Sequence, residues 1–270
     1  IDNKQIDFAY GATVFGMMPK FIFEETGLIN TIQGFYPKTP KLVYFQDDQN
    51  STKIFQNSDH LEKELRGKWG EKGRVNDFRN DESKVISFIQ NLYRNATSPS
   101  LDLANDILGR ELTDLWISGT AKDLLDHYFT SEKTKLYMGM TVIESGPASI
   151  YEPGTAFTIP LMDSGSVYDG YWGFVKTGIW KITESLTKIN SDLGVKFHLN
   201  SSINEVDAFN NSVSFVKDDK DYKLNYDHLI FATDPVSPSK LINDFKNEKN
   251  NLDLIGTSGK VTAFFKNPVK

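Results

Sequence analysis

The spacing of apolar residues constrains the fold of this chain more than any other feature, because its period changes along the sequence. From about 58 to 137 the apolar residues recur at helical spacing, whereas the flanking stretches contain short apolar runs that are typical of strands. Helices are predicted to begin at Ser58 or Asp59 and near Asp81, and to cover 101–117 and 121–129. We therefore expect an α+β fold (α/β mixed).

The residues before this helical block predict one short helix and one hairpin. Pro19 suits the start of a helix, and Gly27 suits a left-handed cap at its end. Strand-like runs at 42–45 and 52–55 flank a polar turn, which predicts a hairpin. Residues 6–15 are rich in β-branched and aromatic types around a glycine, which favours an extended segment with a close backbone approach.

The residues after the helical block change pattern again. Residues 138–172 are rich in Gly, Pro and Ser, so we expect them to be irregular and to line a cavity. A helix is predicted from Gly178 to Gly194, and another from about Pro238 to Asn247. Strands are predicted at 195–199, 203–208, 212–217, 228–233 and 260–266, with Asn210-Asn211 as one turn. The run 229–232 is continuously apolar, as expected of a strand covered on both faces.

Composition excludes several classes of function. The net charge of -6 and the absence of a clustered Lys/Arg surplus argue against a nucleic-acid partner. The chain has no cysteine, which excludes disulfides, thiolate nucleophiles, zinc ribbons and iron–sulfur ligation, and which fits a reducing cytoplasm. No apolar run approaches the ~20 residues of a membrane-spanning helix. Both ends of the sequence are interpreted as lying inside a longer protein.

The residue types that usually carry hydrolytic or metal chemistry form no recognisable set. The four histidines fall on different predicted elements without ligand spacing, so no metal site is expected. No two carboxylates are placed as a catalytic pair, and no serine has the context of a nucleophile elbow. A hydrolase is therefore the least favoured class, and no catalytic residue is assigned. The residues considered were His60, His127, His198, His228, Ser149, Ser164 and Ser166.

Several segments, in their order and spacing, resemble the middle of phytoene-desaturase-like flavoproteins of the amine-oxidase superfamily. The best match covers 173–186, 193–197, 203–206 and 227–235, and residues 8–12 resemble the family's Phe-Asp-x-Gly-Ala segment near the flavin. The sequence differs from the family at Ala9, where an acid is usual, and at Thr177, where a Gly-Gly pair begins. The chain contains no G-x-G-x-x-G, so the strand-turn-helix that holds the FAD pyrophosphate is missing from it.

This resemblance implies the central part of an FAD-dependent oxidoreductase that dehydrogenates, desaturates or isomerises a small hydrophobic substrate. FAD is expected in the intact protein and not in this chain alone. The implied FAD contacts are Gly11, Ala12, Gly178, Ile203, Ala232, Thr233 and Pro235. The implied domains are a segment leaving the FAD domain (1–15), a substrate-binding domain (16–175), a partial FAD-binding domain (176–236) and a return to the substrate-binding domain (237–270).

Several further points stay open at the level of sequence. A non-catalytic module that binds a hydrophobic ligand or a partner protein in an aromatic-rich cavity is the alternative function. The expected location is the cytoplasm, with peripheral membrane contact left open, although no basic amphipathic stretch favours it. The oligomeric state is not predicted. Glycines 27, 178 and 194 have a purely structural interpretation as helix caps.

Overall fold

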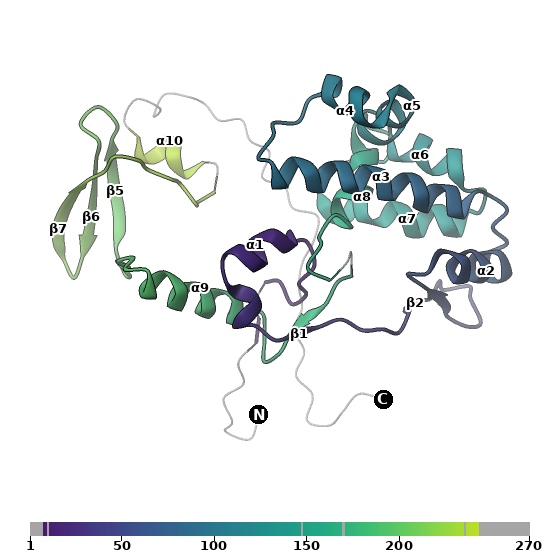
Figure 1. Cartoon of the computed structure of the whole chain (residues 1–270), viewed down its shortest axis with the longest axis horizontal. Helices are drawn as coiled ribbons and strands as arrows, with labels where there is room; N and C mark the ends of the chain where they lie inside the picture. Colours follow the sequence, from purple (N-terminus) through teal and green to yellow (C-terminus); the bar gives the residue numbers. More distant parts are fainter. Residues whose placement is uncertain (1–7, 10, 147, 169–170, 235, 243–270) are drawn as a thin grey trace. The chain divides into compact units, whose positions relative to one another are not determined.

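The computed structural model describes residues 8, 9, 11–146, 148–168, 171–234 and 236–242. They form two compact units, and the division falls between Asn190 and Ser191. Helices and short antiparallel sheets make up the chain, so the predicted α+β class is confirmed (Figure 1). Within the described residues, no helix has the length and apolar character needed to cross a bilayer.

The first unit contains most of the helices and two small antiparallel ribbons. Its helices are α1 (Lys20–Glu25), η1 (Leu28–Asn30), α2 (Ser58–Trp69), α3 (Val75–Arg94), α4 (Leu101–Leu108), α5 (Arg110–Leu112), η2 (Thr113–Ile117), α6 (Ala121–Tyr128), α7 (Glu132–Ser145), η3 (Thr155–Phe157), α8 (Thr158–Met162) and α9 (Trp180–Asp192), which continues past the division. Strand β1 (Gly34–Phe35) pairs with β4 (Phe174–Val175), and β2 (Lys41–Val43) pairs with β3 (Thr52–Ile54). The second ribbon is the hairpin predicted at 42–55, which is confirmed.

Helices α2 to α8, called here the helical layer, enclose the larger hydrophobic core. The apolar stripe of α3 provides its centre, where Phe78 packs against Trp116 and Phe129 with ring centroids 5.0 and 4.8 Å apart. Burying each such side chain stabilises the fold by about 1.5–3 kcal/mol. The helical period of the sequence therefore correctly identified this layer and its core positions.

Two predictions within the helical layer were wrong. Helix α3 begins at Val75 and not near Asp81, because residues 71–73 form a tight hydrogen-bonded turn directly before it. Residues 138–145, expected to be irregular, complete α7, and α8 also lies in the stretch expected to be irregular. Gly139 lowers helix propensity, but a Cβ there would lie 3.2 Å from Leu125, so the glycine lets α7 pack closely on α6.

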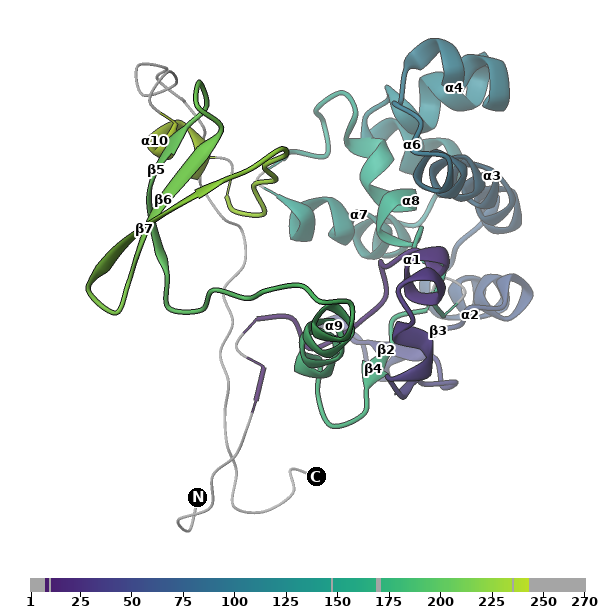
Figure 2. The same ribbon diagram turned by 60° about the vertical axis from the view of Figure 1, so that its left-hand side comes forward.

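A smaller second core joins α1 and η1 to the start of α9. Phe15, Phe23, Leu28 and Val175 are buried there, and the apolar face of α9 packs against them. Figure 2 shows the ribbon of α9 beside that of α1. The predicted cap of the first helix is confirmed, because Gly27 has φ of 79° and lies directly after Thr26, the C-cap residue of α1.

The second unit is built around a three-stranded antiparallel meander. Its strands are β5 (Ser202–Asp207), β6 (Ser212–Lys217) and β7 (Lys220–Asn225), in the order β5-β6-β7, followed by α10 (Ser237–Leu241). The strand predictions for 203–208 and 212–217 are confirmed, as is the turn, where Asn211 has a left-handed φ of 50°. Strand β7 was not predicted. Gly194 also adopts the left-handed conformation expected after α9.

Two predicted strands of the second unit are absent from the structure. Residues 195–199 and 228–233 belong to no sheet, and Ile230 is 87% exposed, so the expected coverage of this run on both faces is wrong. Strands require a neighbouring backbone, and no described strand lies beside these runs. The remainder of the helix predicted to reach Asn247 and the strand predicted at 260–266 lie outside the described residues.

Candidate functional site

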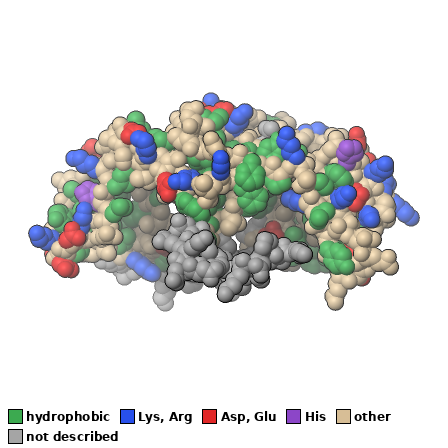
Figure 3. Space-filling model, turned by 90° about the horizontal axis from the view of Figure 1, so that it is seen from below, with side chains coloured by type: hydrophobic (Ala, Val, Ile, Leu, Met, Phe, Trp, Pro, Cys, Tyr) green, Lys and Arg blue, Asp and Glu red, His purple; other side chains and the backbone are tan. Residues whose placement is uncertain are grey.

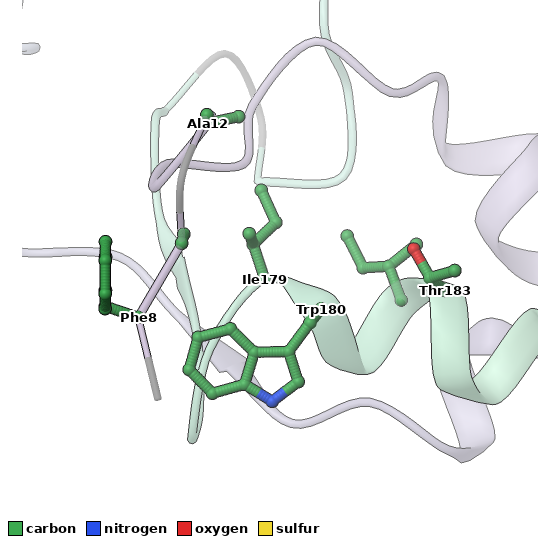
Figure 4. Close-up of a pocket in the computed structure, with 8 residues that line it drawn as sticks. Phe8, Ala12, Ile179, Trp180 and Thr183 are labelled. Atoms are coloured by element: carbon green, nitrogen blue, oxygen red, sulfur yellow. The ribbon is translucent and has the colours of Figure 1, made fainter. Parts of the chain in front are cut away.

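A pocket forms in the first unit where residues 8, 9, 11 and 12, called here segment 8–12, lie beside the start of α9. It has a volume of about 410 Å³. Figure 4 shows Phe8 and Ala12 on the incoming segment and Ile179, Trp180 and Thr183 on the α9 side. The lining residues are Phe8, Ala9, Gly11, Ala12, Ile179, Trp180, Ile182 and Thr183.

A sharp turn positions α9 at this pocket. After β4, the Lys176 N–H donates to the Gln33 carbonyl at 2.7 Å, and the chain then turns through Thr177 and Gly178, which have φ of 73° and 137°. A Cβ at position 178 would lie 2.1 Å from the ring of Trp180, so only glycine permits this arrangement. Thr177 is β-branched, and its left-handed conformation is therefore strained.

The opposite wall of the pocket is fixed by a backbone bridge. The Phe15 N–H donates to the Gly173 carbonyl at 2.8 Å, and the Gly173 N–H donates back at 2.9 Å. This bridge holds the end of the N-terminal segment beside the residues that precede β4. Gly11 and Ala12 are small, so a ligand in the pocket can approach the backbone closely.

The chemistry of the pocket is apolar. None of the eight lining residues is titratable, and its one hydroxyl is that of Thr183. The N-terminus of α9 adds the partial positive charge of a helix end. The lining thus offers no side chain for general acid–base catalysis, and any reaction here would depend on a group that the bound molecule brings.

The structure brings together three of the residues that the resemblance implied. Gly11 and Ala12 line the pocket, and Gly178 sets the turn directly before Ile179 and Trp180. Ile203 lies on β5 opposite Phe215, and Ala232 and Thr233 are exposed, all three in the second unit. Pro235 lies outside the described residues.

Sequence reasoning missed the α9 residues that line the pocket. The sequence gives Trp180 no specific role, because an aromatic residue at helical spacing is more typical of a core than of a ligand platform. One signal could have identified Trp180. It lies two residues after Gly178, and a side chain at that position faces the turn before the helix. Phe8 was quoted only as part of the family-like segment, without a role of its own.

Other features of the described residues offer no competing catalytic site. No group of three or more His, Cys, Asp or Glu residues there is arranged to hold a metal ion. A second, smaller depression of about 330 Å³ lies between α3 and the end of α4, where Ser83, Ser87 and Asn91 face Ile107. Ser83 and Ser87 donate their hydroxyls to helix carbonyls, which is the ordinary role of serine on a helix surface.

Comparison with protein-family models and with curated proteins finds no match to this chain. The resemblance to phytoene-desaturase-like flavoproteins consequently depends on the residues quoted for it. It stays a prediction, and the geometry of the pocket is an independent observation beside it.

Proposed function

We propose that this chain is the central part of an FAD-dependent oxidoreductase, which dehydrogenates, desaturates or isomerises a hydrophobic substrate. The observation that supports the proposal most is that Gly11 and Ala12 line one pocket together with Ile179 and Trp180, the residues that directly follow Gly178. These segments are far apart in the sequence, and both belong to the family-like pattern. A pocket without titratable side chains also suits a reaction whose chemistry comes from a cofactor.

The residues present could contact part of a flavin nucleotide, but they do not include the segment that would hold its pyrophosphate. Gly11, Ala12 and Gly178 would allow close approach to the backbone, and the start of α9 would favour a negatively charged group. FAD, when bound, would supply the hydride acceptor, while Ile179 and Ile182 would help to exclude water. The chain has no G-x-G-x-x-G, so we expect tight binding only when the missing nucleotide-binding segment is present.

The small number of buried apolar side chains in the second unit supports the proposal that this unit is part of a larger domain. Its buried apolar side chains, among the described residues, are those of Val206 and Phe215. Large apolar side chains such as Leu199 and Ile230 are 72% and 87% exposed. A unit that buries so little is expected to pack against further polypeptide, as a partial FAD-binding domain would.

The visible absorption spectrum of the full-length protein encoded by the gene, compared with that of this chain, tests the proposal. We expect flavin bands from the full-length protein and none from this chain. Gly178→Ala in the full-length protein should lose flavin, because the Cβ would displace Trp180. Gly67→Ala is the matched control, because nothing lies within 4 Å of a Cβ on that exposed side of α2. A colourless full-length protein that takes up no added FAD would contradict the proposal.

A non-catalytic binding module is the second candidate, and the apolar lining of the pocket favours it. In that case this chain alone would bind an apolar ligand, and the full-length protein would remain free of flavin. Nucleic acid is not proposed as a partner. On the face shown in Figure 3, Lys and Arg side chains are interspersed with Asp and Glu and form no single basic patch.

A further inference from the structure

Helix α7 has apolar side chains on two opposite faces. Met138 and Val142 on one face are buried in the larger core, where α7 packs against α6, α8 and α2. The other face, called here the outer face of α7, carries Leu136, Met140 and Ile143, which are 64%, 48% and 57% exposed. Figure 1 shows α7 on the lower side of the helical layer, away from α4. Because a helix that is apolar on opposite sides is typical of a helix buried on both, we expect the outer face to be covered.

Acidic residues mark both ends of the outer face of α7. Glu132 lies in the first turn of the helix and Glu144 in its last turn, and both are exposed. Glu132 pairs with Lys135 at 3.0 Å, but an exposed ion pair of this kind is weak. Lys133 is already paired with the acids of the β2–β3 turn. At 1.5 Å per residue the two glutamates are about 18 Å apart, so a covering segment should be apolar in its middle and basic at both ends.

Residues 260–266 of this chain have that pattern in their sequence, although they lie outside the described residues. Lys260 and Lys266 enclose the run Val-Thr-Ala-Phe-Phe, for which the sequence predicts a strand. At about 3.3 Å per residue the two lysines of such a strand are about 20 Å apart, which matches the separation of the two glutamates on α7. Val261, Ala263 and Phe265 would share one face of this strand.

A second copy of the chain fits the outer face of α7 less well. In a pair of α7 helices from two copies, each glutamate at the end of the face lies opposite another glutamate, whichever way the helices run. Like charges in such positions repel, whereas both ends of segment 260–266 carry the opposite charge. The match between this segment and α7 also holds for either direction of the segment, because its two ends are alike.

We propose that residues 260–266 lie along the outer face of α7, with Ala263 over Met140 and each lysine beside one of the two glutamates. The contact removes the exposed apolar side chains of α7 from water and attaches the segment that follows α10 in the sequence to the helical layer. This inference does not depend on the proposed function, because it concerns this chain without any ligand.

Thiol labelling of introduced cysteines tests the contact, because the chain has no cysteine of its own. Ile143→Cys reports on the outer face of α7, and Ile107→Cys on α4 is the matched control. Both isoleucines are 57% exposed and lie beside an acidic residue in the last turn of their helix, so their thiols should otherwise react equally. With an aromatic disulfide reagent we expect the Ile143→Cys thiol to react at least about tenfold more slowly. Adding Phe265→Asp should make the two rates equal.

A disulfide provides the second measurement. Met140 and Ala263 are the central residues of the two apolar sets, so the pair Met140→Cys and Ala263→Cys should form an intramolecular disulfide under mild oxidation. The pair Ile107→Cys and Ala263→Cys should not. Equal labelling rates at positions 107 and 143 without Phe265→Asp would overturn the proposal. So would slow labelling that becomes faster on dilution, the sign of a second copy, or a failure of the first pair to form a disulfide.

Discussion

At the scale of single residues, the carboxylate of Glu71 accepts several backbone hydrogen bonds within the helical layer. Its Oε1 accepts from the N–H groups of Lys72, Gly73 and Thr130 at 2.9, 2.7 and 2.8 Å. Its Oε2 accepts from the Ser131 N–H at 3.1 Å. One buried side chain therefore fixes both the turn before α3 and the turn before α7.

Glu71→Gln is expected to lower the free energy of unfolding by about 2 kcal/mol at neutral pH, because an amide cannot accept all of these bonds. Burial acts to raise the pKa of Glu71, but the N–H donors of Thr130 and Gly73 outweigh it and lower the pKa below 4.5. The stabilisation is thus complete above 4.5 and is lost as the pH falls through the lowered pKa. Urea unfolding at several pH values measures it. Glu111→Gln, at an exposed position, should change nothing.

Thr177 stores strain in the turn before α9. Thr177→Gly should raise the free energy of unfolding by about 1 kcal/mol, because glycine adopts a positive φ without a Cβ clash. Thr177→Ala keeps the Cβ and serves as the control, with no gain expected. Thermal unfolding of the three proteins measures the difference. Equal or lower stability of the glycine variant would show that the hydroxyl of Thr177, which donates to the Lys176 carbonyl, matters more than the strain.

At the scale of elements, Tyr128 connects η2, α6 and α3. Its hydroxyl accepts from Trp116 Nε1 at 3.2 Å and donates to Asp81 Oδ2 at 2.7 Å. Burial, together with the bond to Asp81, raises the pKa of Tyr128, so the hydroxyl stays a donor at all moderate pH values.

Tyr128→Phe should lower the free energy of unfolding by about 1–3 kcal/mol, because it leaves the fully buried Trp116 N–H without an acceptor. Chemical denaturation followed by tryptophan fluorescence measures this loss. Tyr151→Phe, at an exposed tyrosine, is the matched control and should leave the transition unchanged. A Tyr128→Phe protein as stable as the wild type would mean that Trp116 finds another acceptor.

Elements whose signals are local could be predicted from the sequence. The hairpin β2–β3 has a polar turn between two short apolar runs, and Gly27 and Gly194 mark helix ends through backbone conformations that glycine adopts easily. The stripe of α3 follows from helical periodicity. Each of these depends on residues close together in the chain, so the sequence alone is sufficient.

Elements that depend on distant partners could not be predicted. The last part of α7 contains a glycine, and its helical state depends on packing against α6. Residues 195–199 and 228–233 have strand-like sequences but no neighbouring strand in the described structure. For the candidate site, Gly11, Ala12 and Gly178 were identified from the resemblance. Trp180 was missed, because its place in a pocket depends on segment 8–12.

At the scale of the whole molecule, the two units differ in how much apolar surface they bury. The first unit contains both hydrophobic cores, whereas the second depends mainly on Val206 and Phe215. We expect the second unit to open at a lower free energy than α3 and α6.

Phe215→Ala in the full chain should remove amide protection across β5–β7, by about 3 kcal/mol of local stability, while α3 keeps its protection. Hydrogen exchange resolved by residue or peptide measures both regions at once. Phe209→Ala, at a side chain that is 91% exposed, is the control and should leave β5–β7 unchanged. Loss of protection in both units together would show that they unfold as one.

The β1–β4 ribbon also bears on the order in which the chain folds. It pairs Gly34 with Val175, so most of the first unit lies in the loop that the ribbon closes. Contacts of such long sequence separation form late, because closing a long loop costs conformational entropy before the new contacts stabilise the chain. The helical layer, rich in local contacts, can form first. The pocket at α9 is then among the last features to appear, and a ligand that binds there would act on the final step of folding.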